Sequence, residues 1–242
     1  PVTWISAKAT TWPVLGPLVA KIALPLFSGN NLDITYIPIN EKVAVNETSL
    51  LPVQVVEALI HHSSCHAIIR RCTCRDARQC KEHPIQWGCL FLGEGAKEID
   101  SRIARHVTKQ EAVEHLHQSV QNGLVPMVGR VKIDNYIWGV RDLGKLVTVC
   151  FCCHCCCTLL TSLKYLPKDA TDSLVPLKGL HMEIDPALCD ACEICVEACH
   201  ANAIKCKDMK IIRDLKKCKG CGRCIAVCPK NAVSVRVDNI DE

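Results

Sequence analysis

The sequence predicts an α+β protein of two domains, and its length, apolar content and cysteine distribution support this class. The chain has 242 residues, enough for two small domains, and 49% of them are hydrophobic, enough for a core. Its 20 cysteines fall in three separate groups. We expect an apolar segment over residues 1–30, a cysteine-rich mixed α/β domain over 31–160, a linker over 161–180 and a C-terminal domain over 181–242.

The N-terminal segment is apolar but interrupted. Residues 12–27 contain three prolines and Lys21, and this stretch of 16 residues is shorter than the roughly 20 that a membrane-spanning helix needs. The segment also lacks the basic start and cleavage site of a signal peptide. We expect it to pack on the body, to dock a partner subunit, or to lie at a membrane surface. The sequence therefore favours a cytoplasmic protein, peripheral to a membrane only through residues 12–27.

Two helices are predicted in the cysteine-rich domain. The apolar spacing of Pro52–His62 is that of an amphipathic helix. A second helix begins at Thr108, which forms a capping box with Glu111, and it is expected to stop at Gly123.

Four strands are predicted around these helices. Ala67–Arg71 follows the first helix, Val125–Val131 and Tyr136–Val140 follow the second, and Leu146–Cys150 comes last. Asp134 and Asn135 are turn residues between the middle two strands. Two of the strands lead directly into groups of cysteines, which is how a rigid scaffold presents ligands on loops.

The cysteines of this domain have the character of metal ligands. Ligation by cysteine without a carboxylate pattern favours iron–sulfur clusters or zinc, and one zinc ion needs only four of these thiols. We therefore expect one or two iron–sulfur clusters, with a structural zinc as the alternative. Cys65 and Cys206 are expected to be plain buried residues, and His154 is a spacer or a further ligand. The predicted ligands are Cys72, Cys74, Cys80, Cys89, Cys152, Cys153, Cys155, Cys156 and Cys157.

One cysteine pattern occurs twice near the C-terminus. Both runs have the spacing C-x2-C-x2-C-x3-C, and the second ends in Cys228-Pro229 where the first ends in Cys199-His200. This spacing resembles that of the bacterial two-cluster ferredoxins, in which each run gives three thiolates to one [4Fe–4S] cluster and its fourth to the other. The resemblance covers residues 181–242. The first run is Cys189, Cys192, Cys195 and Cys199; the second is Cys218, Cys221, Cys224 and Cys228.

The resemblance implies a ferredoxin-like fold with pseudo-twofold symmetry and two clusters. Short strands over His181–Ile184, Lys210–Ile212 and Val233–Val237 fit that fold. By the family's pattern, one cluster is held by Cys189, Cys192, Cys195 and Cys228, and the other by Cys218, Cys221, Cys224 and Cys199.

The upstream pattern CxCR…C…GCLFLG…CxCCxCCC resembles a cysteine-rich domain that precedes ferredoxin domains in iron–sulfur proteins of anaerobes. A disulfide scaffold fits these spacings poorly, so a reducing, anaerobic cytoplasm is expected. The formal charge of +4 counts every cysteine as neutral, and ligated thiolates make the loaded protein more acidic, so the charge does not indicate nucleic-acid binding. Basic residues from Lys205 to Arg223 either steer an acidic redox partner or form a solvated loop.

These observations predict an electron-transfer protein. Its partners would be redox proteins, with the chain acting as a carrier for, or a subunit of, a larger oxidoreductase. One alternative is a redox enzyme with a catalytic iron–sulfur centre in the N-terminal domain, for which a ligand other than cysteine would argue. A weaker alternative is a redox-sensing or zinc-stabilised interaction protein.

Overall fold

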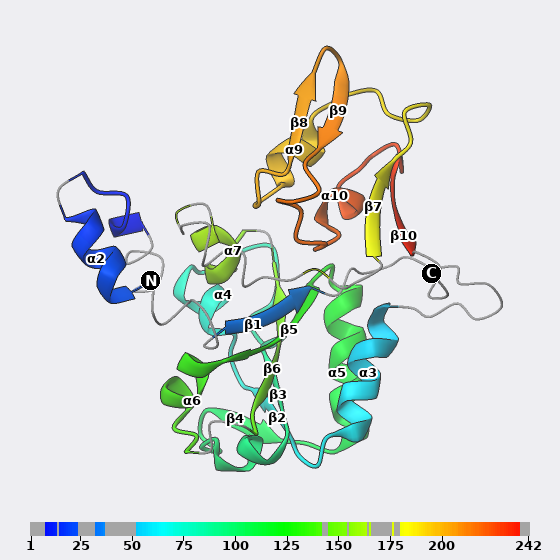
Figure 1. Cartoon of the computed structure of the whole chain (residues 1–242). Coiled ribbons are helices and arrows are strands. Elements are labelled where there is room, and N and C mark those ends of the chain that lie inside the picture. The colour runs from blue at the N-terminus through cyan, green and yellow to red at the C-terminus, as the bar shows by residue number, and fades with distance from the viewer. Residues whose placement is uncertain are drawn as a thin grey trace.

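The computed structural model describes residues 8–13, 15–23, 32–36, 52–141, 145–153, 155–163, 165, 176 and 180–237. A sheet with its covering helices forms the larger part, and a smaller C-terminal part lies against one end of it (Figure 1). Mixed helix and strand content agrees with the predicted α+β class.

A six-stranded sheet forms the larger part, with the strand order β1-β5-β6-β3-β2-β4. All neighbouring strands in it are antiparallel. The strands are β1 (Leu32–Tyr36), β2 (His66–Ile69), β3 (Leu90–Leu92), β4 (Ala104–His106), β5 (Val125–Val131) and β6 (Val147–Cys152).

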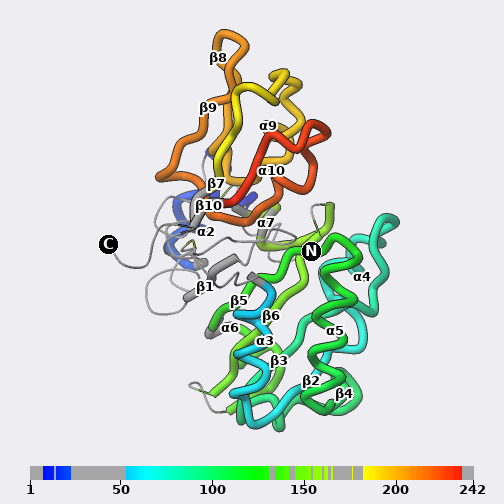
Figure 2. The backbone as a smooth tube through the Cα atoms, turned by 90° about the vertical axis from the view of Figure 1, so that its right-hand side faces the viewer, coloured from blue at the N-terminus to red at the C-terminus, as the bar shows by residue number. Residues whose placement is uncertain are grey.

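Helices α3 and α5 lie side by side on one face of this sheet (Figures 1 and 2). Their bounds, with those of the other described helical elements of this part, are α2 (Gly16–Ala23), α3 (Pro52–His62), α4 (Thr73–Ala77), η3 (Glu94–Glu98), α5 (Lys109–Gln121), α6 (Lys132–Trp138) and α7 (Thr158–Leu163).

Alternating side chains give the sheet two buried faces. Ile68 and Leu90 pack beneath α3 and α5 in the larger core cluster. Their neighbours Ala67 and Phe91 point the other way, into a second cluster with Ala96 of η3. Successive side chains of a strand point to opposite faces, so both sets are fully buried by the same short strands.

The capping box predicted at Thr108 is confirmed. The Thr108 hydroxyl accepts from the Glu111 backbone N–H at 3.2 Å, and the Glu111 carboxylate accepts from the Thr108 N–H at 2.8 Å. Helix α5 ends before Gly123, whose φ of +76° suits glycine, as the sequence indicated. The predicted helix over Pro52–His62 is also confirmed.

The strand predicted over Tyr136–Val140 is wrong, because this segment belongs to helix α6 and its end. Tyr136 and Ile137 are 74% and 54% exposed, so the apolar alternation that suggested a strand does not mark a buried face. Gly139 has a φ of +70°, and the Val140 N–H donates to the Asn135 carbonyl at 2.8 Å. This Schellman geometry ends a helix, and it places Asp134 and Asn135 within α6 rather than in a turn.

The C-terminal part consists of two strand pairs and two short helices. Strand β7 pairs with β10, and β8 pairs with β9, both antiparallel. The predicted strands of this part are therefore observed. The elements are β7 (Leu180–Ile184), α9 (Ile194–Ala198), β8 (Ile204–Lys207), β9 (Lys210–Arg213), α10 (Arg223–Ala226) and β10 (Val233–Val237).

The two connecting segments are described in part. Helix α7 continues to Leu163, into the predicted linker, and most of residues 161–180 lie outside the described residues. Within residues 12–27, helix α2 presents Leu18 and Ile22 to solvent, 59% and 70% exposed. Among the described residues, no helix is long and apolar enough to cross a membrane.

Replacing Thr108 by alanine is expected to lower the free energy of unfolding by about 1 kcal/mol, because the Glu111 backbone N–H loses its acceptor. Urea unfolding followed by circular dichroism measures the change. Thr108→Ser keeps the hydroxyl and should match the parent protein. Equal loss in both variants would contradict a capping role.

Candidate metal centres

Strand direction brings the two upstream cysteine groups together. Strand β3 lies between β2 and β6 and is antiparallel to both, so β2 and β6 run in the same direction. Their C-terminal ends therefore meet at one edge of the sheet. Cys72 follows β2 closely and Cys152 ends β6, which explains how groups far apart in sequence become neighbours.

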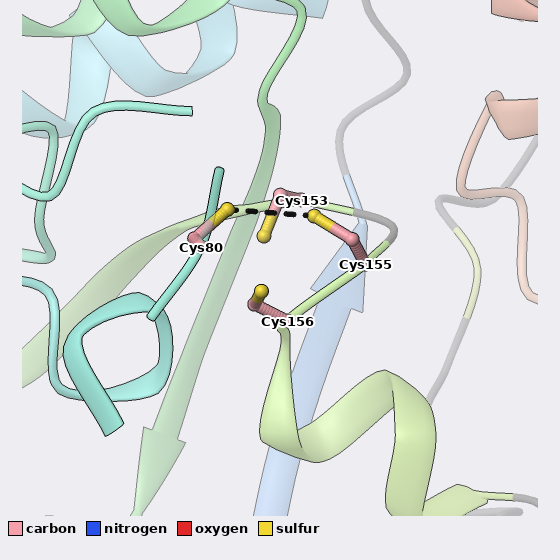
Figure 3. Close-up of side chains that lie close together, drawn as sticks. All are labelled: Cys80, Cys153, Cys155 and Cys156. Carbon is pink, nitrogen blue, oxygen red and sulfur yellow. Dashed lines mark hydrogen bonds between the residues drawn. The ribbon is translucent and has the colours of Figure 1, made fainter. Parts of the chain in front are cut away.

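Four thiols at this edge point toward one another (Figure 3). The sulfur atoms of Cys80, Cys153, Cys155 and Cys156 all lie within 4.8 Å of one another, and Cys80 Sγ is 3.5 Å from Cys155 Sγ. Cys153 and Cys156 are buried, whereas the other two are half-buried at the rim. We call these residues the compact thiol set.

A helix-ending turn positions Cys80 in this set. Gln79 has a left-handed φ of +48°, and the Cys80 N–H donates back to the Arg75 carbonyl at 2.9 Å. This closes helix α4 in the Schellman manner and directs Cys80 toward the end of β6. Cys153, Cys155 and Cys156 come from the turn between β6 and α7, so the set joins two separate segments.

Six further thiols form a second group beside the first, which we call the sheet thiol set. Cys89 Sγ lies 3.2 Å from Cys150 Sγ, and Cys157 Sγ lies 3.3 Å from Cys152 Sγ. Cys152 interacts electrostatically with Cys89 and with Cys74 of α4, and Cys72 also interacts with Cys89. The two pairs and the cysteines at α4 therefore form one group. The members are Cys72, Cys74, Cys89, Cys150, Cys152 and Cys157.

Burial and hydrogen bonds between thiols shift the pKa values of the sheet thiol set. A hydrogen bond with Cys74 raises the pKa of Cys72 and lowers the pKa of Cys74 to about 5. A hydrogen bond with Cys89 and burial raise the pKa of Cys150. Thiols held protonated by burial become ligands when a cation compensates the charge of the thiolate, so such a group is suited to a metal.

Arg75 lies between the two thiol sets and is fully buried. Its guanidinium donates to the Phe151 carbonyl at 2.9 Å and to the Trp87 carbonyl. It also interacts electrostatically with Cys72 on one side and Cys153 on the other. A buried guanidinium needs anionic partners, which ligated thiolates supply.

Asp134 adds a carboxylate beside the sheet thiol set. Thr148 donates a hydrogen bond of 2.8 Å to it, and burial raises the pKa of Asp134 to about 6. Its charge interacts with Cys74 and Cys150. The sequence contained no metal-binding pattern around this residue, because only the fold brings α6 close to Thr148 of β6 and to the thiols.

The two C-terminal cysteine runs share a left-handed backbone conformation at two matching positions. Ala191 and Glu193 have positive φ values of 56° and 61°, and Gly220 and Gly222 have 65° and 72° at the matching positions of the second run. Each run also ends in a hydrogen bond from a backbone N–H to its last sulfur, at 3.3 Å in both cases. These bonds join Ala203 to Cys199 and Ala232 to Cys228.

The last cysteine of each run lies near the other run. Cys195 interacts electrostatically with Cys189, Cys192 and Cys228. A cavity lined by these four cysteines and by apolar side chains such as Ile184 lies between the strands and α9. The residues present therefore fit a bound cluster with four thiolate ligands.

The second C-terminal group is half-buried throughout. Cys224 interacts electrostatically with Cys221, Cys218 and Cys199. Burial raises the pKa of Cys221 to about 11 and that of Cys224 to about 12. Such thiols carry a negative charge near neutral pH only when a metal compensates it, so this group also fits a metal–sulfur centre.

This second group borders the compact thiol set. Cys221 packs against the core cluster that contains Cys153 and Cys156. Arg223 is buried at the same contact and interacts electrostatically with Cys221, Cys153 and Cys155. Arg223 is thus an interior residue, and its predicted place among the surface basic residues is wrong.

The remaining predicted positions are not members of these groups. Cys65 packs against the second core cluster, and Cys206 lies on β8, where it interacts electrostatically with Cys189. Both are half-buried, so the prediction that they are buried is wrong. His154 lies outside the described residues. Cys150 was not among the predicted ligands, although the spacing of the Cys150–Cys157 run offered a signal for it. No local pattern marked Arg75.

Comparison with known families agrees with the C-terminal geometry. Residues 211–234 match the model of the 4Fe-4S binding domain family. The matched segment contains Cys218, Cys221, Cys224 and Cys228. The chain therefore contains a 4Fe-4S binding domain and binds at least one [4Fe–4S] cluster. A comparison with curated proteins found no match.

Replacing Arg75 by methionine is expected to lower the free energy of unfolding by about 2 kcal/mol, because the buried Phe151 carbonyl and the part-buried Trp87 carbonyl lose their donor. Urea unfolding of anaerobically purified protein measures this change. Arg102→Met is the control, since that side chain is 88% exposed and should change stability by less than about 0.5 kcal/mol. Equal effects would contradict a structural role for Arg75.

Proposed function

We propose that the protein is an iron–sulfur electron-transfer protein that passes single electrons between redox partners. It would act as a carrier for, or a subunit of, a larger oxidoreductase. The observation that carries this proposal is the arrangement of the eight C-terminal cysteines, where the last cysteine of each run lies with the first three of the other. Two-cluster ferredoxins use this exchange of ligands.

Two [4Fe–4S] clusters are assigned to the C-terminal part. Cys189, Cys192, Cys195 and Cys228 would hold one, and Cys218, Cys221, Cys224 and Cys199 the other. When bound, such clusters accept and release single electrons at potentials set by charge, hydrogen bonds and solvent access.

The chain itself provides hydrogen bonds and differences in solvent access that would set these potentials. Backbone N–H groups donate to the sulfurs of Cys199 and Cys228. Such donors stabilise the more negative, reduced state of a cluster that these thiolates hold. Cys192 of one site is exposed, whereas all four cysteines of the other site are half-buried. The two sites therefore differ in solvent access, and we expect the exposed site to exchange electrons with the outside.

One further cluster is assigned to the sheet thiol set. Its six thiols exceed the four that a cluster needs, and Arg75 offers a buried positive charge beside Cys72 and Cys89. Together with the compact thiol set, these residues extend a series of thiol sites from the C-terminal part into the sheet domain.

The surface of β8 and β9 is suited to an acidic partner. Lys205, Lys207 and Lys210 are exposed on this hairpin, and Met209 at its turn is 76% exposed. Positive charges around an apolar contact increase the rate of association with a negatively charged protein. The proposed partner is therefore an acidic redox protein.

Metal and sulfide analysis of anaerobically purified protein tests the proposal. The two C-terminal clusters alone require about eight irons and eight acid-labile sulfides per chain. Replacing Cys221 by serine is expected to remove the signal of one C-terminal cluster in electron paramagnetic resonance of the reduced protein, and to leave the N-terminal centres intact.

Cys206→Ser is the matched control, because it replaces a nearby half-buried cysteine outside both runs. It should retain all iron and all signals. Parent protein without acid-labile sulfide, or a Cys221→Ser variant that keeps every cluster signal, would contradict the proposal.

A second candidate function is redox catalysis at the sheet thiol set. Asp134 favours it, because a carboxylate beside Cys74 and Cys150 offers a ligand weaker than thiolate. An iron held in this way can exchange its ligand for a substrate.

Replacing Asp134 by asparagine separates the two functions. If Asp134 binds iron, Asp134→Asn should change the electron paramagnetic resonance spectrum of the N-terminal cluster while the C-terminal signals stay unchanged. An unchanged N-terminal spectrum would exclude this role. Asp100→Asn, which alters an exposed ion pair with Arg102, is the control.

A further inference from the structure

The compact thiol set is unusually tight for an iron–sulfur cluster. Its four sulfurs all lie within 4.8 Å of one another. Four metal–sulfur bonds of about 2.3 Å in a tetrahedron separate neighbouring sulfurs by about 3.8 Å. In a [4Fe–4S] cluster each thiolate binds a different iron, so its sulfurs lie further apart than they do around one ion. The observed spacing suits a single ion.

The C-terminal cysteines provide a comparison within the same molecule. They belong to the runs that the 4Fe-4S pattern assigns to clusters. Within the described part of the chain, no three of them have sulfurs that all lie within 4.8 Å. The same holds for the sheet thiol set among the described residues. The compact thiol set therefore differs in kind from the other cysteine groups.

We propose that Cys80, Cys153, Cys155 and Cys156 bind one divalent transition-metal ion, Zn²⁺ or Fe²⁺, in a tetrahedral four-thiolate site. Thiolate ligands in this geometry select zinc or iron. The site deepens the proposed function, because it places a centre of a different type between the sheet thiol set and the C-terminal cluster sites.

Two buried arginines match the charge of such a site. One divalent ion with four thiolates carries a charge of about −2. Arg75 interacts with Cys153 from the α4 side, and Arg223 interacts with Cys153 and Cys155 from the C-terminal part. Buried charges are stable only when they are paired, so the two guanidinium groups and the loaded site stabilise each other.

The position of the site gives it a structural consequence. Cys80 belongs to the segment after α4, the other three ligands follow β6, and Arg223 comes from the C-terminal part. An ion bound here would fix these segments together at the contact between the two parts. Loss of the ion should therefore loosen that contact as well as the turn between β6 and α7.

One alternative ligand set shares Cys155. Glu82, His83 and Cys155 also bring potential ligand atoms within 4.8 Å of one another, at a more exposed position. The four-cysteine set is preferred because it completes a tetrahedron without water and has two of its members buried. His83→Ala distinguishes the two sets.

The test is metal and sulfide analysis of the full chain, purified anaerobically, as parent protein and as Cys80→Ser. The variant is expected to lose one zinc or iron per chain and no acid-labile sulfide. Loss of iron and sulfide in equal numbers would overturn the single-ion site, as would a variant that retains all its metal. Cys155→Ser, at the exposed rim, repeats the test if Cys80→Ser does not fold.

Two controls define the ligand set. Cys65→Ser replaces a cysteine outside every thiol set and should keep the full metal content. His83→Ala should also keep it, and loss of one ion in this variant would overturn the four-cysteine assignment. X-ray absorption of the parent protein identifies the ligands of the ion without mutation. It is recorded at the zinc edge if the ion is zinc. If the ion is iron, it is recorded at the iron edge of protein from which the clusters have been removed. Four sulfurs at about 2.3 Å are expected.

The outcome is separable from that of the proposed function. Absence of sulfide from the parent protein refutes the electron-transfer proposal, whatever ion the compact thiol set binds. Sulfide that is present but lost from Cys80→Ser refutes only the single-ion site. Hydrogen exchange of α10 in Cys80→Ser reports the contact between the two parts, where faster exchange is expected.

Discussion

The common direction of β2 and β6 is the constraint on which the rest of the N-terminal structure depends. Strand β3 lies between them and pairs with both, so two cysteine-bearing segments leave the sheet at the same edge. Buried apolar side chains on both faces hold that order in place. Without it, the thiols after β2 and those after β6 would have no common site.

Buried thiolates at that edge require compensating charge. Arg75 enters between the two thiol sets from α4, and Arg223 enters from the C-terminal part. Each guanidinium is desolvated, which is costly unless an anion lies close by. Metal-bound thiolates meet this need, so the arginines and the metal centres are mutually dependent. The contact between the two parts of the molecule follows from the same requirement.

Local patterns predicted several elements correctly. The capping box at Thr108 and the apolar spacing of Pro52–His62 act within a few residues, so their helices could be found from the sequence. The strand predicted over Tyr136–Val140 was wrong because short apolar runs fit a strand or a helix, and the Schellman end at Gly139 favoured the helix. Arg223 looked like a surface residue because it ends a stretch, from Lys205, that is rich in basic residues.

The sequence by itself determined the C-terminal chemistry, since the ligand spacing of a [4Fe–4S] loop is encoded within a run of eleven residues such as Cys218–Cys228. Only the tertiary structure decided how the upstream cysteines divide into a compact thiol set and a sheet thiol set. It also placed Cys150, Asp134 and Arg75 among them. The physical reason is distance along the chain. Strand order and side-chain alternation bring these residues together, and neither property can be read from the residues around a single cysteine.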